Sequence, residues 1–302
     1  MKKGLKKIIN KLPYIKALQQ ENFDLKKNSC WFPGHFYSPV ISIDAIKKRQ
    51  SEIWKNTEAD GIQGVDLQTN QQLELVENIS QYYKDLPFIA GNKSKTRYQF
   101  ENDYYSYTDG IVLYSMIRHF QPKRIIEIGS GFSSAVMLDT NELFFDNKID
   151  LIFIEPYPER LNSLLTEKDK KQNFIIQSDV QIVSLDEFKK LQAGDILFVD
   201  STHVVKSGSD VNHILFEILP VLRRGVLIHF HDVFYPFEYP KNWVFEGRNW
   251  NEDYFLKAFL MYNKHFKIRL FSHYLHEHHQ EVFRGLSLSY KNTGGNLWLE
   301  KN

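Results

Sequence analysis

The sequence predicts an α/β fold with a doubly wound, mainly parallel sheet of seven strands. Five short apolar segments alternate with helix-like segments, which is typical of parallel strands covered by helices on both faces. They are RIIEIG (124–129), DLIFIEP (150–156), NFIIQSD (173–179), DILFVDS (195–201) and GVLIHFHD (225–232). Two further apolar segments, FKIRLF (266–271) and NLWLEK (296–301), have no helix of comparable quality between them. We therefore expect them to form a C-terminal antiparallel hairpin that closes the sheet.

Helices are expected before the sheet as well. Residues 4–28 carry apolar side chains at three- and four-residue spacings, which predicts an amphipathic helix with a kink at Pro13. Helical patterns also cover about 70–90 and 109–120. The expected organisation is a basic helical extension (1–30), a cap region of helices and loops (31–108), and a sheet domain (109–302) with an aromatic lid insertion (234–259).

The charge distribution bears on partners and location. A net charge of +1 argues against a nucleic-acid-binding protein, because phosphate contacts require a concentrated basic face. Residues 1–30 nevertheless contain eight lysines against Glu21 and Asp24, a local charge of +6. A basic helix over 1–28 is suited to peripheral contact with an acidic membrane; the alternatives are packing on its own domain or on a second copy in a homodimer.

The sequence also bears on the cellular compartment. No segment is apolar enough to span a membrane or to act as a signal peptide. The single cysteine, Cys30, agrees with a reducing environment. We expect a cytoplasmic protein, with or without peripheral membrane contact.

A glycine turn follows the first predicted strand. Gly129 and Gly131 allow the backbone to turn sharply and to approach a ligand, and the amides around Ser133 and Ser134 open the next helix. Glu155 and Asp179 stand at the ends of the second and third strands. In an open parallel sheet these ends meet at one edge, where a carboxylate can accept hydrogen bonds from a ribose or from an adenine amine. The pattern predicts a nucleotide-type ligand.

These motifs resemble a known family. EIGSGFSS, FIEP, SD and LFVDSTH are similar to the class I S-adenosylmethionine-dependent methyltransferases, and within them to catechol-type and bacterial sugar or macrolide O-methyltransferases. The resemblance covers about 109–301 and implies a Rossmann-like sheet closed by the antiparallel hairpin. It implies that Glu127 lies near the methionine amino group of the methyl donor, that Glu155 binds its ribose and that Asp179 binds its adenine. The expected cofactor-binding residues are Glu127, Gly129, Ser130, Gly131, Ser133, Ser134, Glu155, Asp179 and Asp200.

The ends of the fourth and fifth strands carry the residues suited to chemistry. Asp200, His203, His231 and Asp232 are expected at the reaction side of the sheet, where a histidine can remove the proton of an acceptor hydroxyl. In the metal-dependent branch of the family, acids at the positions of Asp200 and Asp232 ligate magnesium. Val233 stands where that branch commonly has Asn, so bound Mg²⁺ and a metal-free histidine base both stay open.

The aromatic lid insertion is the expected cover of the acceptor site, because long loops at strand ends usually lie over the ligand. Its flat aromatic and polar side chains suit a sugar or another small molecule, and the candidate acceptor contacts are Tyr235, Trp243, Arg248 and Trp250. The leading hypothesis is therefore an O-methyltransferase acting on a sugar or glycan hydroxyl.

Two alternatives accompany that hypothesis. A NAD-dependent oxidoreductase would use the same kind of turn, but it expects a third glycine where Ser134 stands. A non-catalytic methyltransferase-like binding subunit would have no chemical need for both Asp200 and His203.

Overall fold

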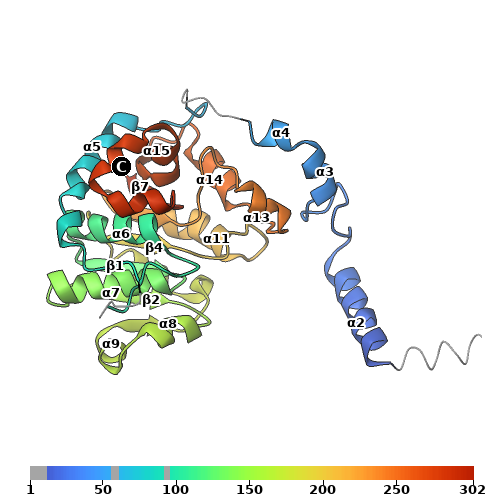
Figure 1. The fold of residues 1–302 in the computed structure, drawn as a ribbon. Coiled ribbons are helices and arrows are strands. Elements are labelled where there is room, and N and C mark those ends of the chain that lie inside the picture. The colour runs from blue at the N-terminus through green and yellow to red at the C-terminus, as the bar shows by residue number, and fades with distance from the viewer. Residues whose placement is uncertain (1–11, 56–60, 92–95) are drawn as a thin grey trace, which may run out of the picture. The chain divides into compact units, whose positions relative to one another are not determined.

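The structure is a computed structural model that describes residues 12–55, 61–91 and 96–302. The chain forms two compact units. The smaller unit comprises residues 1–56 and 240–249, and the larger unit comprises residues 57–239 and 250–302. Figure 1 shows the elements of both.

The larger unit is built on one sheet of seven strands in the order β3-β2-β1-β4-β5-β7-β6. β1 to β5 pair in parallel, and β7 lies antiparallel between β5 and β6. The strands are β1 (Arg124–Ile128), β2 (Asp150–Ile154), β3 (Phe174–Ile176), β4 (Ile196–Val199), β5 (Leu227–Phe230), β6 (Phe266–Phe271) and β7 (Leu297–Lys301). The predicted doubly wound sheet with its antiparallel C-terminal pair is confirmed.

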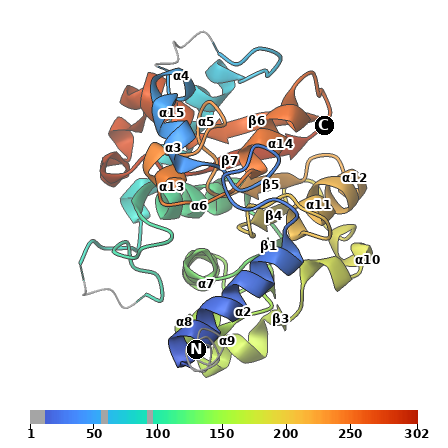
Figure 2. The ribbon, with the colours of Figure 1, turned by 90° about the vertical axis from the view of Figure 1, so that its right-hand side faces the viewer.

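Helices cover both faces of the sheet. Figure 2 shows α6 and α7 on one face and α10, α11 and α12 on the other. The helices of the larger unit are α5 (Thr69–Ser80), α6 (Tyr107–Phe120), α7 (Phe132–Phe144), α8 (Glu159–Leu164), α9 (Glu167–Gln172), α10 (Leu185–Phe188), α11 (Asp210–His213), α12 (Leu219–Val221), α14 (Glu252–Leu260) and α15 (Ser272–His278). Shorter 3₁₀ turns lie at Tyr83–Asp85, Val180–Ile182, Gln280–Gly285 and Ser287–Lys291, and a π-helical segment at Ile214–Ile218 joins α11 to α12.

The core lies between the sheet and these helices. The four residues Ile125–Ile128 of β1 are all buried, as are Ile196–Val199 of β4, because each strand is covered on both sides. α6 is buried along almost its whole length, from Thr108 to Ile117. This rigid packing fixes the strand ends from which the site residues project.

The structure adds detail to two expectations about helices. The connection between β6 and β7 contains α15 and two 3₁₀ turns, whose interrupted pattern gives a weak helical signal. Pro13 does not kink a helix in the described part of the chain. It occupies the first position of α2 (Pro13–Asn28), where its missing N–H costs nothing because that group has no partner within a helix. The predicted start of this helix, residues 4–11, lies outside the described residues.

In the described part of the smaller unit there are four helices, and few side chains are buried. They are α2 (Pro13–Asn28), α3 (Ile43–Lys48), α4 (Gln50–Ile53) and α13 (Lys241–Phe245). Its two chain segments are joined by a hydrogen bond from the Ile41 amide to Asn249 (3.0 Å) and by an edge-on contact between the rings of Trp54 and Phe245 (5.7 Å). α2 buries no residue.

Candidate active site

The turn after β1 depends on one glycine more than on the other. Gly129 has φ +80°, and a β-carbon there would stand 1.7 Å from the carbonyl oxygen of Asp200. Only glycine combines that backbone conformation with so close an approach. Gly131 is extended (φ −176°), a conformation that any residue adopts, so its backbone does not require glycine. Its amide donates a 3.0 Å hydrogen bond to Ser134 Oγ at the start of α7.

Glu127 lies inside this turn. The side chain is fully buried, and its carboxylate accepts hydrogen bonds from the hydroxyls of Ser133 (2.6 Å) and Ser134. Burial raises the pKa of Glu127 to about 8, although the serine hydroxyls oppose the shift. Glu127 therefore braces the turn against the first residues of α7, whatever it contacts in a ligand.

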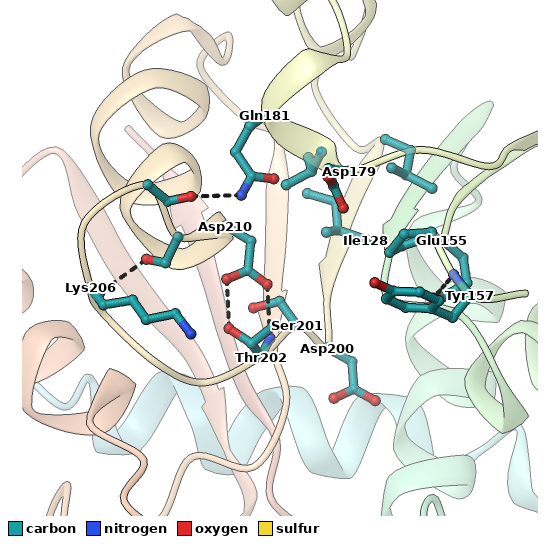
Figure 3. Close-up of a pocket in the computed structure, with 16 residues that line it drawn as sticks. Ile128, Glu155, Tyr157, Asp179, Gln181, Asp200, Ser201, Thr202, Lys206 and Asp210 are labelled. Atoms are coloured by element: carbon teal, nitrogen blue, oxygen red, sulfur yellow. Dashed lines mark hydrogen bonds between the residues drawn. The ribbon is translucent and has the colours of Figure 1, made fainter. Parts of the chain in front are cut away.

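The acid after β2 holds the other side of the turn. Glu155 accepts hydrogen bonds from the backbone amides of Ser130 (3.0 Å) and Tyr157 (2.8 Å), one on each carboxylate oxygen. It is half-buried and faces a cavity of about 360 Å³. Figure 3 shows Glu155, Asp179 and Asp200 around this cavity.

The cavity is lined by residues that follow β1, β2, β3 and β4. They are Ile128, Gly129, Ile154, Glu155, Pro156, Tyr157, Asp179, Val180, Gln181, Asp200, Ser201, Thr202, Lys206, Gly208, Ser209 and Asp210. Gln181 and Thr202 were not among the site residues expected from the sequence. Asp210 accepts from the amide and the hydroxyl of Thr202 (2.9 and 2.6 Å), which closes the loop after β4 over the cavity wall.

A cluster of acids and imidazoles lies next to the cavity. His203 Nε2 is 3.4 Å from Asp200 Oδ1 and 3.8 Å from Asp232 Oδ2. One donor atom from each of these three residues lies within 4.8 Å of the other two. Asp200 belongs to both the cavity lining and this cluster. The spacing and the donor types fit a divalent cation, because such ions take carboxylate oxygens and imidazole nitrogens in this way.

Two members of this cluster have strained backbones. His203 and Asp232 both have positive φ angles (59° and 55°), which are unfavourable for residues with a β-carbon. The backbone of Asp232 packs closely on Gly295, where an added β-carbon would come within 2.9 Å of the Asp232 Cα. Strained residues persist only where the surrounding structure determines them, and they gather at functional sites.

Glu252 completes the surroundings of His203. This acid is the first residue of α14, is almost completely buried and lies 2.9 Å from His203 Nδ1. The Trp250 ring packs beside the imidazole, with 4.4 Å between ring centroids. No sequence pattern points to Glu252, because 49 positions separate it from His203 and it stands among the aromatic residues of the lid insertion.

The charges of the cluster shift the pKa values of its members. Burial acts to lower the pKa of His203, but Asp200, Glu252 and Asp232 outweigh it and hold that pKa well above its usual value. Burial acts to raise the pKa of Asp200, but His231 and His203 outweigh it, so that pKa is lowered. The acids around His203 therefore favour the charged form of its imidazole.

His229, in β5, and His231, just after β5, differ in role. His231 lies 3.4 Å from Asp232 Oδ1 and packs against the ring of Tyr105, and the nearby carboxylates raise its pKa despite burial. His229 is stacked on Phe198, with 4.1 Å between ring centroids, and burial lowers its pKa well below the usual value. His229 is therefore a neutral core residue, although neither ring nitrogen has a hydrogen-bond partner among the described residues.

The four candidate acceptor contacts lie in different environments. Trp250 lies beside His203. Tyr235 is buried and packs against Phe271 and Tyr274, so its ring belongs to the interior of the larger unit. Trp243 and Arg248 belong to the smaller unit, where the guanidinium stacks over the indole at 4.3 Å.

Comparisons with known proteins agree with this geometry. Residues 126–233 match a family model described as "Methyltransferase domain". A protein of Archaeoglobus fulgidus, described as uncharacterized, is 31% identical over 189 residues, which are 61% of this chain and 84% of that protein.

Several solved structures are similar to the chain. One is an O-methyltransferase of tomaymycin synthesis from Streptomyces achromogenes in complex with S-adenosylmethionine (14% identity, TM-score 0.39, 85% of this chain and 96% of that one). Another is an O-methyltransferase from Bacillus cereus with bound S-adenosylhomocysteine (13% identity, TM-score 0.38, 86% and 100%).

The strand order and the glycine turn with its acids agree with the resemblance to the class I S-adenosylmethionine-dependent methyltransferases. Residues 126–233 of the chain therefore form a methyltransferase domain.

Proposed function

We propose that the protein transfers a methyl group from S-adenosylmethionine to a hydroxyl of a sugar or glycan intermediate. The observation that carries the proposal is the double position of Asp200. This residue lines the cavity between Glu155 and Asp179, and its carboxylate also lies 3.4 Å from His203. A methyl donor in the cavity would thus present its reactive end to the acid and imidazole cluster.

The chain's own residues would prepare the acceptor. S-adenosylmethionine supplies an activated methyl group, which an acceptor oxygen attacks in line as its proton leaves. His203, with Asp200 beside it, is placed to receive that proton, and His231 on the other side of Asp232 is a second candidate. The buried position of both imidazoles excludes bulk water from the reacting oxygen.

A divalent cation is part of the proposal, with Asp200 and Asp232 as its carboxylate ligands. Bound there, a cation such as Mg²⁺ would lower the pKa of an acceptor hydroxyl. The short distances from His203 Nε2 to the carboxylates of Asp200 (3.4 Å) and Asp232 (3.8 Å) support this account.

A sugar acceptor is supported by the side chains around His203. Trp250 offers an aromatic face next to the imidazole, and Tyr239 lies 6.0 Å from Trp250 between ring centroids. Sugars present C–H faces that stack on such rings, while their hydroxyls take polar partners. The acceptor class proposed here rests on this juxtaposition.

We also propose a cytoplasmic location with peripheral membrane contact through residues 1–28, and a homodimer as the alternative use of the same helix. α2 exposes Tyr14 and Phe23 (72% and 61%) together with Lys26 and Lys27 in its last turn, a pattern suited to a membrane interface. Within the described part of the chain, no helix combines the length and apolar character that crossing a bilayer requires. Sedimentation with anionic vesicles, compared between the full chain and a chain lacking residues 1–28, tests the contact.

The central test is a screen for methyl transfer to nucleotide sugars and oligosaccharides, run with and without a chelator. We expect turnover with at least one sugar hydroxyl and its loss on chelation. Thermal stabilisation by S-adenosylmethionine, with NAD as the control ligand, checks the donor separately. Tight donor binding without transfer to any acceptor class would instead support the non-catalytic binding subunit.

A further inference from the structure

The hydrogen bond between Glu252 and His203 determines which nitrogen of the imidazole faces the acids. Glu252 Oε2 lies 2.9 Å from His203 Nδ1, and Glu252 is a carboxylate that can only accept when ionised. When Glu252 is ionised, Nδ1 carries the proton of this bond. Nε2 is left on the opposite side of the ring, 3.4 Å from Asp200 and 3.8 Å from Asp232.

The backbone next to Glu252 fixes His203 as well. The His203 carbonyl accepts from the amides of Asn251 (3.0 Å) and Glu252 (3.2 Å). The Asn251 side chain bonds both the amide and the carbonyl of Val205 (2.6 and 3.3 Å). Trp250 packs against one side of the imidazole. Three consecutive residues thus hold the strained His203 through its ring and its main chain.

The resulting donor set is two carboxylates and one imidazole nitrogen. Two ligands bound to one ion at about 2.0–2.2 Å lie roughly 3–4 Å apart, and the measured separations from Nε2 fall in that range. Magnesium prefers an all-oxygen environment and keeps several waters, whereas manganese, iron and zinc ions accept imidazole readily. A carboxylate on the far ring nitrogen is the usual support of a metal-bound histidine.

We propose that Glu252 is a positioning residue that presents His203 Nε2 as a nitrogen ligand, so that Asp200, His203 and Asp232 select a transition-type divalent cation over Mg²⁺. This inference rests on the proposed function for the use of the cation, but the binding itself is independent of any acceptor. It names an ion class and a supporting residue that the sequence motifs leave open.

The experiment measures metal binding to the full chain after chelator treatment, by calorimetry with Mn²⁺ and with Mg²⁺. We expect Mn²⁺ to bind at least about tenfold more tightly than Mg²⁺. Glu252→Gln should weaken Mn²⁺ binding by about 10- to 100-fold, as is typical when the partner of a metal-bound histidine is altered. Equal or tighter binding of Mg²⁺ by the unaltered chain overturns the ion selectivity, and unchanged Mn²⁺ affinity in Glu252→Gln overturns the role of Glu252.

Glu238→Gln is the matched control. Glu238 is also an acid of the lid insertion and is hydrogen-bonded to Tyr254 (2.6 Å), outside the three-residue metal cluster. Its substitution should leave Mn²⁺ affinity unchanged. Binding of S-adenosylmethionine by each variant reports whether the variant is folded, since neither acid lines the donor cavity.

A spectroscopic measurement on the unaltered chain tests whether His203 binds the cation. Pulsed electron paramagnetic resonance of Mn²⁺ bound to the unaltered chain should show coupling to an imidazole nitrogen. Bound Mn²⁺ without nitrogen coupling excludes His203 as a ligand and overturns the proposal. Because no methyl transfer is measured, a failure to find a sugar acceptor would refute the proposed function and leave these results unaffected.

Discussion

The carbonyl oxygen of Asp200 occupies the space into which a side chain at residue 129 would project. A β-carbon on Gly129 would lie 1.7 Å from that oxygen. The turn after β1 and the acid after β4 are therefore in direct contact through their backbones. A change in the turn at Gly129 is therefore expected to displace Asp200.

Replacing Gly129 by Ala should destabilise the protein far more than a positive φ alone would. Gly208 is the matched control, because it has φ +74° but no atom within 4 Å of an added β-carbon. Gly208→Ala should cost roughly 1–2 kcal/mol for the left-handed conformation. Gly129→Ala adds a backbone clash to the same cost, so we expect a larger loss, measured by urea unfolding. Equal losses in the two variants would mean that the turn can move away from Asp200 without cost.

Glu127 should make the stability of the protein depend on pH. Its pKa is about 8 in the folded state, against 4.5 for the unperturbed group, so the folded state holds a proton that the unfolded state has released between these values. The stabilising contribution is complete below about pH 4.5 and is lost as pH rises towards 8. Glu127→Gln mimics the protonated acid and should flatten this part of the stability profile in urea titrations. An unaltered profile would show that Glu127 is ionised across the range.

Glu155→Ala should weaken binding of S-adenosylmethionine. The substitution removes the acceptor for the Ser130 and Tyr157 amides as well as a carboxylate that faces the cavity. Hydrogen bonds to a charged group contribute about 1.5–3 kcal/mol, so we expect a loss of about 10- to 100-fold in affinity by calorimetry. The control is Glu159→Ala, an exposed acid nearby that does not line the cavity. A comparable loss in the control would assign the effect to net charge.

His203→Ala should abolish turnover while leaving the methyl donor bound. His203 is proposed either to receive the acceptor proton, a role that typically contributes about 10²- to 10⁴-fold to rate, or to bind the cation, and it is absent from the cavity lining. We expect kcat to fall by that order once an acceptor is known, with the affinity for S-adenosylmethionine within about twofold of the original. His265→Ala, at an exposed histidine, serves as the control. Undiminished turnover would remove His203 from the reaction.

Asp232→Asn should lower the pKa of both neighbouring histidines. The Asp232 carboxylate lies 3.8 Å from His203 and 3.4 Å from His231, and it favours the charged form of each imidazole. NMR titration of the imidazole protons in metal-free protein measures the change. Because a raised histidine pKa stabilises the fold at low pH and this contribution is lost as pH rises through that pKa, the variant should lose more stability at pH 6 than at pH 9. If neither titration curve shifts, Asp232 does not stabilise the charged form of His203 or His231.

The fold and the meeting of the strand-end acids at one cavity could be predicted because their signals are local. The strands are short apolar segments, Gly129 and Glu155 follow β1 and β2 directly, and Asp179 lies three residues after β3. In a parallel sheet such positions meet at one edge without further information. Asp200 and Asp232 were found by the same rule.

The rest of the site depends on contacts between distant segments. Glu252 reaches His203 only because α14 packs back over the loop after β4, and no spacing rule relates positions 49 residues apart. Tyr235 belongs to the same aromatic segment as Trp250, yet one is buried in the interior and the other lies beside His203. Aromatic composition alone cannot separate a core ring from a ring at a ligand site.

The position of β7 affects the order in which the two halves of the site arise during translation. The strand inserts between β5 and β6, although the ribosome makes it after both, and Gly295 just before it packs closely on Asp232. Every residue of the donor cavity lies at or before position 210. A nascent chain therefore contains every residue that lines the cavity well before its final strand can pack near Asp232, and until then the edge of β5 is open to pairing with other chains.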